Sequence, residues 1–283
     1  MWPRLTWRAA RYGAVLVDQP LDPAVVLCDL DGVVWLARKA IPGSVEAIAR
    51  LRAGGRRVVF VTNNSSAVVA DQEAALADVG IPASGDVLTS AGAAAALVDA
   101  GERVLVAGGP GITEAIEARG ASAVAGDDPA GVDANVVMVG FHRNFDYERM
   151  RIATTAVLGG ARLVATNDDA TYPTPDGPIP GGGAILAGIA TASGRQAVVA
   201  GKPYVPMADA VRAMVGDLPP ERLLVVGDRP STDGQFAVTI GCPFALVRSG
   251  VTRPGDAVGV PVAIDVPDLA RVVDALRDEH VPG

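Results

Sequence analysis

Two acidic residues, Asp29 and Asp31, directly follow a short apolar run, residues 25–28 (Val-Val-Leu-Cys). Because the run is short and rich in β-branched residues, it predicts a strand buried on both faces. If the backbone stays extended, residues two positions apart point to the same side, and Gly32 permits the sharp turn that must follow. We interpret the two carboxylates as a metal-assisted nucleophile and a proton-transferring acid. The alternative is a strand end with two solvated acids.

A second acidic pair follows another apolar run farther along the chain. Residues 223–226 (Leu-Leu-Val-Val) precede Gly227-Asp228, and Asp233 comes five residues after Asp228. Hard divalent cations prefer carboxylate oxygens contributed by separate chain segments. Two strand ends with aspartates therefore indicate a metal site rather than surface solubility.

Two further polar segments follow predicted strands. Residues 62–66 (Thr-Asn-Asn-Ser-Ser) come after the predicted strand 57–61 (Arg-Val-Val-Phe-Val) and can form a plain turn or a phosphate cradle. We favour the cradle, because it follows a buried strand and an acid pair. Lys202, between Gly201 and Pro203, follows the apolar run 197–200. A lone lysine is usually solvated, but this one is expected at the same end of the sheet as the acids.

The order of elements predicts an α/β fold with a doubly wound parallel sheet, whose ligands bind at the carboxyl ends of the strands. Residues 86–185 are either more of this sheet or a second, smaller α/β unit. The second possibility is favoured, because strands in this block do not end in paired acids and turn-forming residues flank it at 89–92 and 174–183. We therefore expect a core of residues 1–85 and 186–283, with residues 86–185 inserted. The stretch 174–183 predicts a hairpin followed by a flexible joint.

Composition limits the classes of partner. The 283 residues include 24 Lys and Arg against 32 Asp and Glu, for a net charge of −8, which disfavours a nucleic acid but permits a small phosphorylated substrate. Cys28 is expected in the core and Cys242 has no nearby partner, so a disulfide framework or zinc site is not indicated. Residues 1–22 predict an irregular leader whose apolar run, 14–17, is too short for a signal peptide or a membrane span. A cytoplasmic protein without membrane contact is expected.

Four segments, each after a predicted strand and in the right order, resemble the motifs of the haloacid dehalogenase superfamily: Asp29-Leu30-Asp31-Gly32, Thr62-Asn63, Lys202, and Gly227-Asp228 with Thr232-Asp233. The insert is similar to the large α/β cap of the NagD-like and p-nitrophenylphosphatase-like branch. Further matches are Thr166-Asn167-Asp168 with Pro180-Gly181, and residues 249–252. The resemblance covers roughly residues 24–275 and implies a cap domain over residues 86–185.

The resemblance implies a chemical role for each acid. Asp29 would attack the phosphorus of a phosphomonoester and form an aspartyl-phosphate. Asp31 would protonate the leaving oxygen and then activate water. Mg²⁺ would bind the carboxylates of Asp29 and Asp228 and the backbone carbonyl of Asp31.

It also implies residues that hold the phosphoryl group. Thr62, the backbone of Asn63 and Lys202 would bind its oxygens. Asp233 would orient Lys202 and the waters of the metal. The residues after Asp228 depart from the family pattern, which makes a shifted helix start expected there and leaves the role of Asp233 open. Trp35 stands where relatives have a tyrosine, and we favour a packing role for it over a substrate contact.

Substrate choice is expected in the cap, which closes over the phosphate. The residues that would contact the substrate are Asn167, Asp168, Asp169 and Tyr172. Asp168 and Asp169 favour substrates with hydroxyls or amines. His142 and Arg143 would face the site or a contact between two caps in a homodimer. A catalytic role for His142 is not favoured, since the aspartates already fill the acid–base roles.

The expected function is a Mg²⁺-dependent phosphatase acting on small phosphomonoesters, namely sugar or polyol phosphates such as glycerol phosphate or phosphoglycolate. The alternatives are a nucleotide monophosphatase or a pyridoxal phosphate phosphatase of the same fold. A third possibility is a catalytically weak module that binds a phosphorylated ligand.

Overall fold

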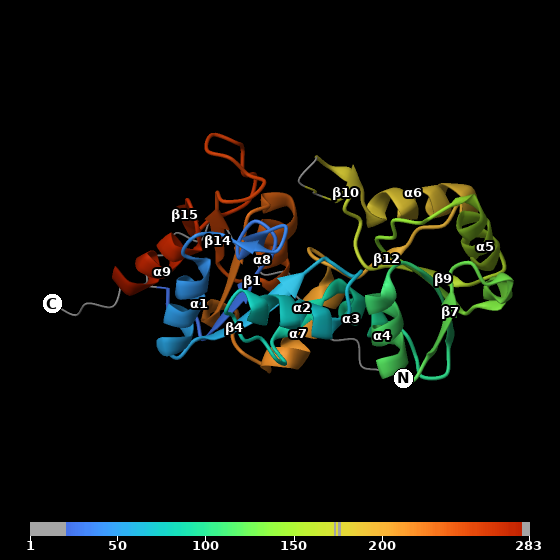
Figure 1. Ribbon diagram of the computed structural model, residues 1–283, viewed down its shortest axis with the longest axis horizontal. Coiled ribbons are helices and arrows are strands. Elements are labelled where there is room, and N and C mark those ends of the chain that lie inside the picture. Colours follow the sequence, from blue (N-terminus) through green and yellow to red (C-terminus); the bar gives the residue numbers. More distant parts are fainter. Residues whose placement is uncertain (1–20, 173, 175–176, 279–283) are drawn as a thin grey trace.

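The structure is a computed structural model that describes residues 21–172, 174 and 177–278. Of the leader expected over residues 1–22, all but the last two residues lie outside this described part. Figure 1 shows two units side by side, each built of a sheet with helices packed on it. The α/β fold with a second, smaller α/β unit is confirmed.

The core unit is organised around a six-stranded sheet in the order β15-β14-β13-β1-β4-β5, with every neighbouring pair parallel. Its strands are β1 (Val25–Cys28), β4 (Arg57–Thr62), β5 (Val87–Thr89), β13 (Leu223–Gly227), β14 (Phe244–Val247) and β15 (Ile264–Val266). Successive side chains of β1 enter two different apolar layers, because a strand alternates its faces. The sheet is therefore covered on both faces, as the doubly wound prediction requires.

Helices supply those two layers. One layer contains buried residues of α1 (Ser44–Ala53), α2 (Val69–Asp78) and α9 (Leu269–Asp278). The other contains those of α3 (Ser90–Ala95), α7 (Val205–Val215) and α8 (Gln235–Ile240). Single helical turns lie at Pro220–Arg222 and Pro230–Gly234.

The cap unit is organised around a five-stranded parallel sheet in the order β12-β9-β8-β6-β7. Its strands are β6 (Arg103–Ala107), β7 (Ser122–Ala125), β8 (Val136–Val139), β9 (Arg162–Ala165) and β12 (Val198–Val199). Helix α4 (Pro110–Ala118) packs with one apolar layer, and α5 (Tyr147–Leu158) and α6 (Gly182–Ser193) pack with the other. A turn of 3₁₀ helix spans Pro129–Asp133.

Sheet membership differs from the expected boundaries at two strands. Val87–Thr89 lies in the core sheet, paired with β4, although residues 86–185 were expected in the cap. Val198–Val199 pairs with β9 in the cap sheet, although a core strand was expected there. The reason is that turn-forming residues mark where a strand ends and not which sheet it joins. The exact division into domains stays a prediction.

The expected flexible joint after the 174–183 hairpin is wrong. The hairpin itself is present, as β10 (Thr171–Tyr172) paired antiparallel with β11 (Ile179–Pro180). A helix, α6, begins at Gly182 immediately after it and continues to Ser193. Apolar residues such as Leu186 and Ile189 are buried along α6, and this tertiary packing outweighs the low helix propensity of its glycines.

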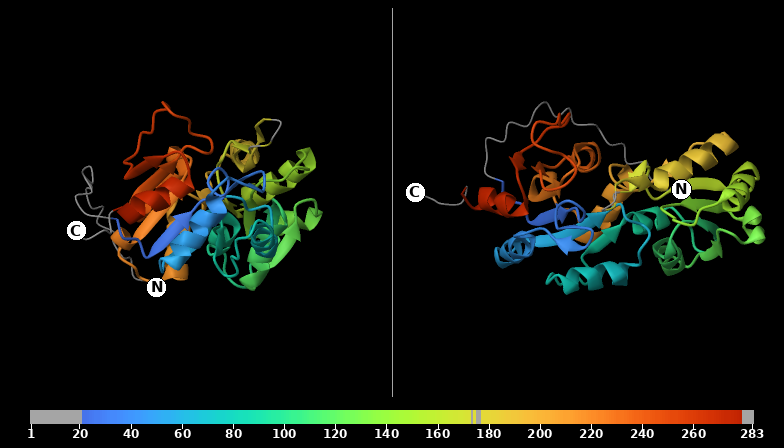
Figure 2. Two further views of the ribbon diagram at one scale, coloured as in Figure 1. Left: turned by 60° about the vertical axis from the view of Figure 1, so that its left-hand side comes forward. Right: turned by 45° about the horizontal axis from the view of Figure 1, so that its top comes forward.

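A second small hairpin belongs to the core. β2 (Trp35–Leu36) pairs antiparallel with β3 (Lys39–Ala40), and the turn between them consists of Ala37 and Arg38. This hairpin and the β10–β11 hairpin of the cap lie near one another at the opening between the two units (Figures 1 and 2). Trp35 is only 2% exposed and belongs to the core, so the packing role is confirmed.

The fold also bears on the expectations about a membrane span and about the two cysteines. None of the helices within the described ranges is long and apolar enough to cross a membrane. Cys28 is buried in β1, as expected, and Cys242 is also a free thiol.

Candidate active site

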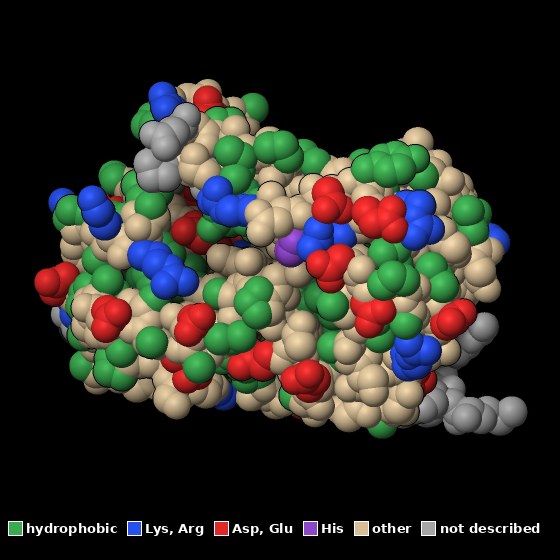
Figure 3. Space-filling view, turned by 45° about the vertical axis from the view of Figure 1, so that its right-hand side comes forward, with side chains coloured by type: hydrophobic (Ala, Val, Ile, Leu, Met, Phe, Trp, Pro, Cys, Tyr) green, Lys and Arg blue, Asp and Glu red, His purple; other side chains and the backbone are tan. Residues whose placement is uncertain are grey.

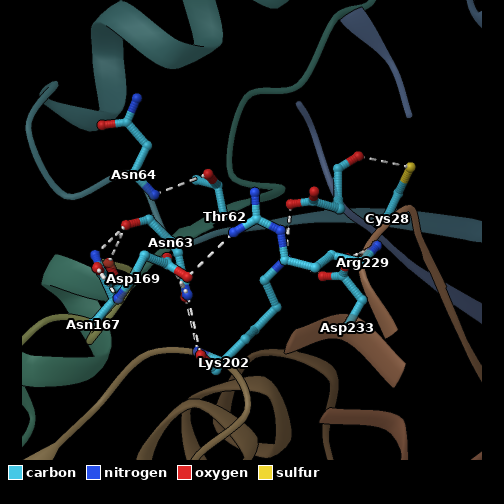
Figure 4. A network of polar contacts seen from close by, with 11 residues as sticks. Cys28, Thr62, Asn63, Asn64, Asn167, Asp169, Lys202, Arg229 and Asp233 are labelled. Carbon is cyan, nitrogen blue, oxygen red and sulfur yellow. Dashed lines mark hydrogen bonds and ion pairs between the residues drawn. The ribbon is translucent and has the colours of Figure 1, made fainter. Parts of the chain in front are cut away.

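Carboxylates from two distant chain segments contact the ammonium group of Lys202. Its Nζ lies 2.7 Å from Oδ1 of Asp29, which follows β1, and 2.7 Å from Oδ1 of Asp233. Figure 4 shows these segments meeting, with the labelled side chains of Lys202, Asp233 and Thr62 entering one region from different elements. Lys202 follows a strand of the cap sheet, not a core strand as expected, yet it reaches the same place.

The surroundings of Lys202 keep it charged. Its side chain is 4% exposed and contacts two carboxylates. Burial alone lowers the pKa of Lys202, but the charges of Asp233 and Asp29 and their hydrogen bonds raise it above its ordinary value. A permanently charged ammonium at this position can bind a phosphoryl oxygen.

Three carboxylates form a compact group beside this lysine. Asp29, Asp228 and Asp233 each offer an oxygen, and these oxygens lie within 4.8 Å of one another. When all three are ionised, as binding of a cation requires, their charges against the single charge of Lys202 leave an excess of two, which is the charge of a divalent cation. The side chain of Asp31 is not part of this group, so the predicted contribution of Asp31 to a metal site rests on its backbone carbonyl alone.

Two glycines leave room for Asp228. A Cβ atom on Gly250 would lie 1.9 Å from Asp228 Oδ2, and one on Gly32 would lie 2.4 Å from the same oxygen. The backbone N–H of Val251 donates to this oxygen at 2.5 Å. A buried, oriented carboxylate beside two others is the oxygen-only donor set that suits Mg²⁺.

Asp233 has both carboxylate oxygens engaged by protein groups. Oδ1 accepts from Lys202, and Oδ2 accepts from the backbone N–H of Arg229 at 3.1 Å. It lies in the single turn Pro230–Gly234, which has π-helical hydrogen bonding, so that α8 begins only at Gln235. The shift of the helix start relative to the family stays a prediction, and the engaged oxygens suit a residue that positions Lys202.

Asp31 differs from Asp29 in its electrostatic surroundings. Burial raises the pKa of Asp31, while a hydrogen bond from Trp35 and the charges of Lys202, Arg38 and Arg229 lower it in part. The net effect is an increase. A carboxyl group with a raised pKa retains a proton more readily and is suited to donate it.

The polar residues after β4 hold the lysine segment. Asn63 Oδ1 accepts from the backbone N–H of Lys202 at 2.8 Å, and its Nδ2 donates to the carbonyl of Lys202 at 3.0 Å. Thr62 Oγ1 accepts from the backbone N–H of Asn64 at 3.0 Å. The two predicted phosphate-binding segments, the residues after β4 and Lys202, therefore lie next to each other (Figure 4).

Three of the four cap residues expected to contact substrate make hydrogen bonds to residues of the core, and their contact with substrate stays a prediction. Asn167 Nδ2 donates to the carbonyl of Asn63 at 2.8 Å. Asp169 accepts from Asn63 Nδ2 at 3.1 Å and pairs with Arg229 at 3.5 Å. Asp168 accepts a short hydrogen bond from the hydroxyl of Tyr204. Sequence reasoning missed Tyr204, although it lies only two residues after Lys202.

The fourth cap residue, Tyr172, has a different environment. Its ring stacks on Phe141 with centroids 4.7 Å apart and planes 12° apart. The charge of Asp31 contributes to raising the pKa of Tyr172, after burial, so the two side chains are close enough to interact. Figure 3 shows a hollow between the two units with acidic and basic side chains along it.

His142 lies at a different place. It lines a cavity of about 190 Å³ at the carboxyl ends of β6 and β7, together with Gly109 and Arg149. None of the acidic residues discussed above lines this cavity. The view that His142 takes no part in the acid–base chemistry is consistent with this placement.

Comparison with known proteins defines the class. Residues 26–122 match the model of the haloacid dehalogenase-like hydrolase family, and residues 199–278 match a second model described as HAD-hydrolase-like. Human chronophin is 35% identical over 261 residues, covering 87% of this chain and 88% of its own. The chain therefore belongs to the haloacid dehalogenase-like hydrolases, and to their NagD-like, p-nitrophenylphosphatase-like branch.

The chain is also similar to two phosphatases of this family from other organisms. D-glycerol 3-phosphate phosphatase of Mycobacterium tuberculosis is 36% identical over 241 residues, covering 82% of this chain and 65% of its own. A structure of glycerol phosphate phosphatase from that organism in complex with magnesium superposes with a TM-score of 0.79, at 32% identity over 89% of this chain and 76% of that one. The p-nitrophenyl phosphatase of Archaeoglobus fulgidus superposes with a TM-score of 0.83, at 29% identity over 90% and 99%.

Proposed function

We propose that this protein is a Mg²⁺-dependent phosphatase that hydrolyses small phosphomonoesters through an aspartyl-phosphate intermediate on Asp29. The observation that carries the proposal is the placement of Lys202 Nζ at 2.7 Å from both Asp29 and Asp233, next to Asp228. A nucleophilic carboxylate, a phosphate-binding cation and an acidic metal site need to occupy one place for this reaction. Membership of a phosphatase-containing family supports the same conclusion.

The two aspartates after β1 divide the chemistry. A carboxylate oxygen of Asp29 attacks phosphorus and the bond from phosphorus to the ester oxygen breaks. Asp31 gives its proton to the departing oxygen and later takes one from the water that hydrolyses the acyl phosphate. The raised pKa of Asp31 favours the protonated form needed in the first step.

The remaining site residues would bind Mg²⁺ and the phosphoryl oxygens. Asp29, Asp228 and the carbonyl of Asp31 would hold Mg²⁺, which when bound offsets the negative charge of the phosphoryl oxygens. Lys202, Thr62 and the backbone of Asn63 would bind those oxygens as charge spreads over them. Asp233 would keep Lys202 directed at the phosphate, since it accepts from its Nζ at 2.7 Å.

Small sugar or polyol phosphates, including glycerol phosphate and phosphoglycolate, are the proposed substrates. A glycerol phosphate phosphatase is among the relatives, and a 5'-nucleotidase of Bacillus subtilis is another, at 32% identity. A nucleotide monophosphatase or a pyridoxal phosphate phosphatase therefore remains the alternative of the same chemistry. A catalytically weak phosphate-binding module is the alternative of another class, and activity measurements separate it.

The setting of the enzyme is also a proposal. A net charge of −8 disfavours nucleic-acid partners. Two cysteines without a disulfide framework favour a reducing compartment, so we propose a cytoplasmic enzyme. A homodimer formed through the cap is proposed as the assembly. Fractionation of cells and light scattering of the purified protein test these two points, and a monomer would exclude the dimer.

The function is tested with p-nitrophenyl phosphate, with and without Mg²⁺, in the wild type and in Asp29→Asn. The variant should lose at least about a thousandfold of kcat and should no longer yield a phosphorylated peptide after acid quench. Asp209→Asn is the matched control and should behave as wild type, because Asp209 is an exposed acid of α7 that pairs with nearby Arg212. Hydrolysis by Asp29→Asn at the wild-type rate would disprove the role of Asp29.

A further inference from the structure

The cap contributes a carboxylate that contacts two strand ends of the core. Asp169 lies in the cap between β9 and the β10–β11 hairpin. Its Oδ2 accepts from Asn63 Nδ2 at 3.1 Å, and its Oδ1 pairs with the guanidinium of Arg229 at 3.5 Å. Asn63 follows β4, and Arg229 follows β13. Each oxygen of this one side chain is therefore directed at a different segment of the core.

Both of these core residues also hold Lys202. Asn63 binds the backbone of Lys202 through hydrogen bonds of 2.8 and 3.0 Å. The backbone N–H of Arg229 donates to the side chain of Asp233 at 3.1 Å, and the carbonyl of Arg229 accepts from the N–H of Asp233 at 2.8 Å. Asp233 in turn accepts from Lys202 Nζ at 2.7 Å. Asp169 is thus connected to the backbone of Lys202 by one route and to its ammonium group by another.

These contacts form a closed ring of residues. The ring runs from Asp169 through Asn63, Lys202, Asp233 and Arg229 and returns to Asp169. Figure 4 shows these residues, all labelled, within one network. Because the loop before the β10–β11 hairpin supplies Asp169, the ring is complete only while this loop of the cap lies against the core.

The backbone around Asp169 is fixed to the cap. Its N–H donates to Asn167 Oδ1 at 3.2 Å, and its carbonyl accepts from the N–H of Gly183 at 2.9 Å. A Cβ atom on Gly181 would lie 2.4 Å from this carbonyl oxygen, and one on Gly183 would lie 2.3 Å from the carbonyl oxygen of Asp168. The glycines at the start of α6 therefore allow the loop to pack directly on this helix, so that the position of Asp169 follows that of the cap.

The charge of Asp169 suits an indirect role at the site. A carboxylate directed at the phosphoryl oxygens would repel them, since both are negative. Both oxygens of Asp169 are directed at donors instead, an amide and a guanidinium. Hydrogen bonds that involve an ionised group are stronger than those between neutral groups. Asp169 can therefore orient Asn63 and Arg229, and through them Lys202, without touching the phosphate.

We propose that Asp169 is a positioning residue, which completes the ring of contacts around Lys202 when the cap lies against the core and so sets the affinity of Lys202 for the phosphoryl group. The proposal rests on the proposed function, in which Lys202 binds the phosphoryl oxygens. It differs from the expectation that Asp169 contacts the leaving group. A residue that acts through Lys202 affects all phosphomonoesters alike, whereas a contact with the leaving group depends on its chemistry.

The test compares wild type with Asp169→Asn on two esters with different leaving groups, p-nitrophenyl phosphate and glycerol 3-phosphate. Inorganic phosphate, which carries no leaving group, is used as a competitive inhibitor. In the variant kcat/KM should fall about tenfold for both esters, and the inhibition constant of phosphate should rise by a similar factor. A loss confined to one ester, or an unchanged inhibition constant, would overturn the proposal.

Two glycine variants of α6 test the position of Asp169 without removing its charge. In Gly183→Ala the added Cβ must displace the loop of Asp169, so kcat/KM and inhibition by phosphate should change in the same direction as in Asp169→Asn. Gly188→Ala is the matched control, because its Cβ would meet the flexible end of Met150 at 3.0 Å. Both values should stay at those of wild type in this control, and wild-type values in Gly183→Ala would contradict the proposal.

A charge control completes the set. Glu148→Gln removes an exposed cap charge that pairs with Arg151 within α5, and it should leave kcat/KM and inhibition by phosphate unchanged. An equal effect in Glu148→Gln would show that Asp169 acts only through the overall charge of the cap and would overturn the proposal. If the wild type hydrolyses neither ester in the presence of Mg²⁺, the proposed function itself fails.

Discussion

The side chain of Asn63 binds the backbone of Lys202 at two points, accepting from its N–H at 2.8 Å and donating to its carbonyl at 3.0 Å. A single amide thus fixes the position of Lys202, the proposed phosphate-binding residue, relative to β4. The same Nδ2 also donates to Asp169 of the cap at 3.1 Å. Asn63 therefore connects the core, the lysine segment and the cap.

Replacing the Asn63 side chain should weaken the contacts among the core, the Lys202 segment and the cap. Asn63→Ala removes three hydrogen bonds, and at about 0.5–1.5 kcal/mol each the free energy of unfolding should fall by about 2–4 kcal/mol. The KM for substrate should rise, since Lys202 is no longer held in place. Asn64→Ala is the neighbouring control. Within the described residues the Asn64 side chain accepts one hydrogen bond, from the N–H of Ser66, so this change should cost about 1 kcal/mol. Chemical denaturation and steady-state kinetics measure both, and equal effects of the two variants would contradict the role of Asn63.

Gly250 should control metal affinity through the space it leaves for Asp228. In Gly250→Ala the added Cβ would lie 1.9 Å from Asp228 Oδ2, so this carboxylate must move. We expect Mg²⁺ affinity to fall by about tenfold or more, measured by the Mg²⁺ concentration that gives half-maximal activity. Gly92→Ala is the matched control, because its Cβ would meet nothing closer than Thr89 Oγ1 at 3.7 Å and α3 should gain slightly in stability. Normal Mg²⁺ affinity in Gly250→Ala would show that Asp228 is not a ligand.

Metal removal should make stability depend on pH near neutrality. In the absence of a cation, burial and the charge of Asp233 raise the pKa of Asp228 to about 6, whereas an unfolded aspartate has a pKa of about 3.9. The folded protein then binds a proton that the unfolded chain releases. The contribution of Asp228 to the free energy of unfolding is therefore complete below a pH of about 4 and is lost as the pH rises through about 6. The melting temperature of protein treated with a chelator should therefore fall between about pH 5 and 7.

Mg²⁺ should reverse that fall at pH 7, because a ligand that binds only the folded state stabilises it, by about 2.7 kcal/mol at a hundredfold excess over Kd. Asp228→Asn is the informative variant. Without metal its melting temperature should fall less between pH 5 and 7 than that of the wild type, and Mg²⁺ should add little. Identical pH profiles for the two proteins would refute the assignment.

The two thiols should react slowly and in a defined order. Cys28 is fully buried in β1, and burial raises its pKa. Cys242 is partly exposed at its surface, and burial of its sulfur raises the pKa to about 12. Since only the thiolate reacts, an aromatic disulfide reagent at pH 8 should modify Cys242 slowly and Cys28 more slowly still, with both reacting at once in denaturant. Cys242→Ser should remove the first phase, and fast modification of Cys28 in the native protein would contradict its placement.

The acids of the site could be placed from sequence because they depend on local rules. Asp29 and Asp31 directly follow a buried strand, and alternate residues of an extended backbone point to the same side. This places both side chains at the carboxyl end of the strand, where ligands bind in such sheets. Asp228 follows β13 for the same reason, and β13 is the direct neighbour of β1. Parallel neighbours end at one edge, so their terminal residues meet.

Contacts between distant segments could not be placed in this way. Asp168 pairs with Tyr204, and Asp169 pairs with Arg229 and Asn63, which all come from distant parts of the chain. The periodicity of a sequence does not indicate such pairings. Lys202 was expected at the site because a core strand would precede it, but that strand joins the cap sheet. The helix α6 was missed because its glycines resemble a linker, and only burial of residues such as Ile189 against the sheet makes it helical.

The path of the chain from β12 to Lys202 has a mechanical consequence. Val199 ends a strand of the cap sheet, and Lys202, whose Nζ contacts Asp29, comes three residues later. At about 3.5 Å per residue this tether is about 10 Å long, too short to absorb a large rotation of one unit against the other. We expect a rotation of the cap to displace Lys202, the proposed phosphate-binding residue, so that release of the product and loss of the contact between Lys202 and the phosphate occur together.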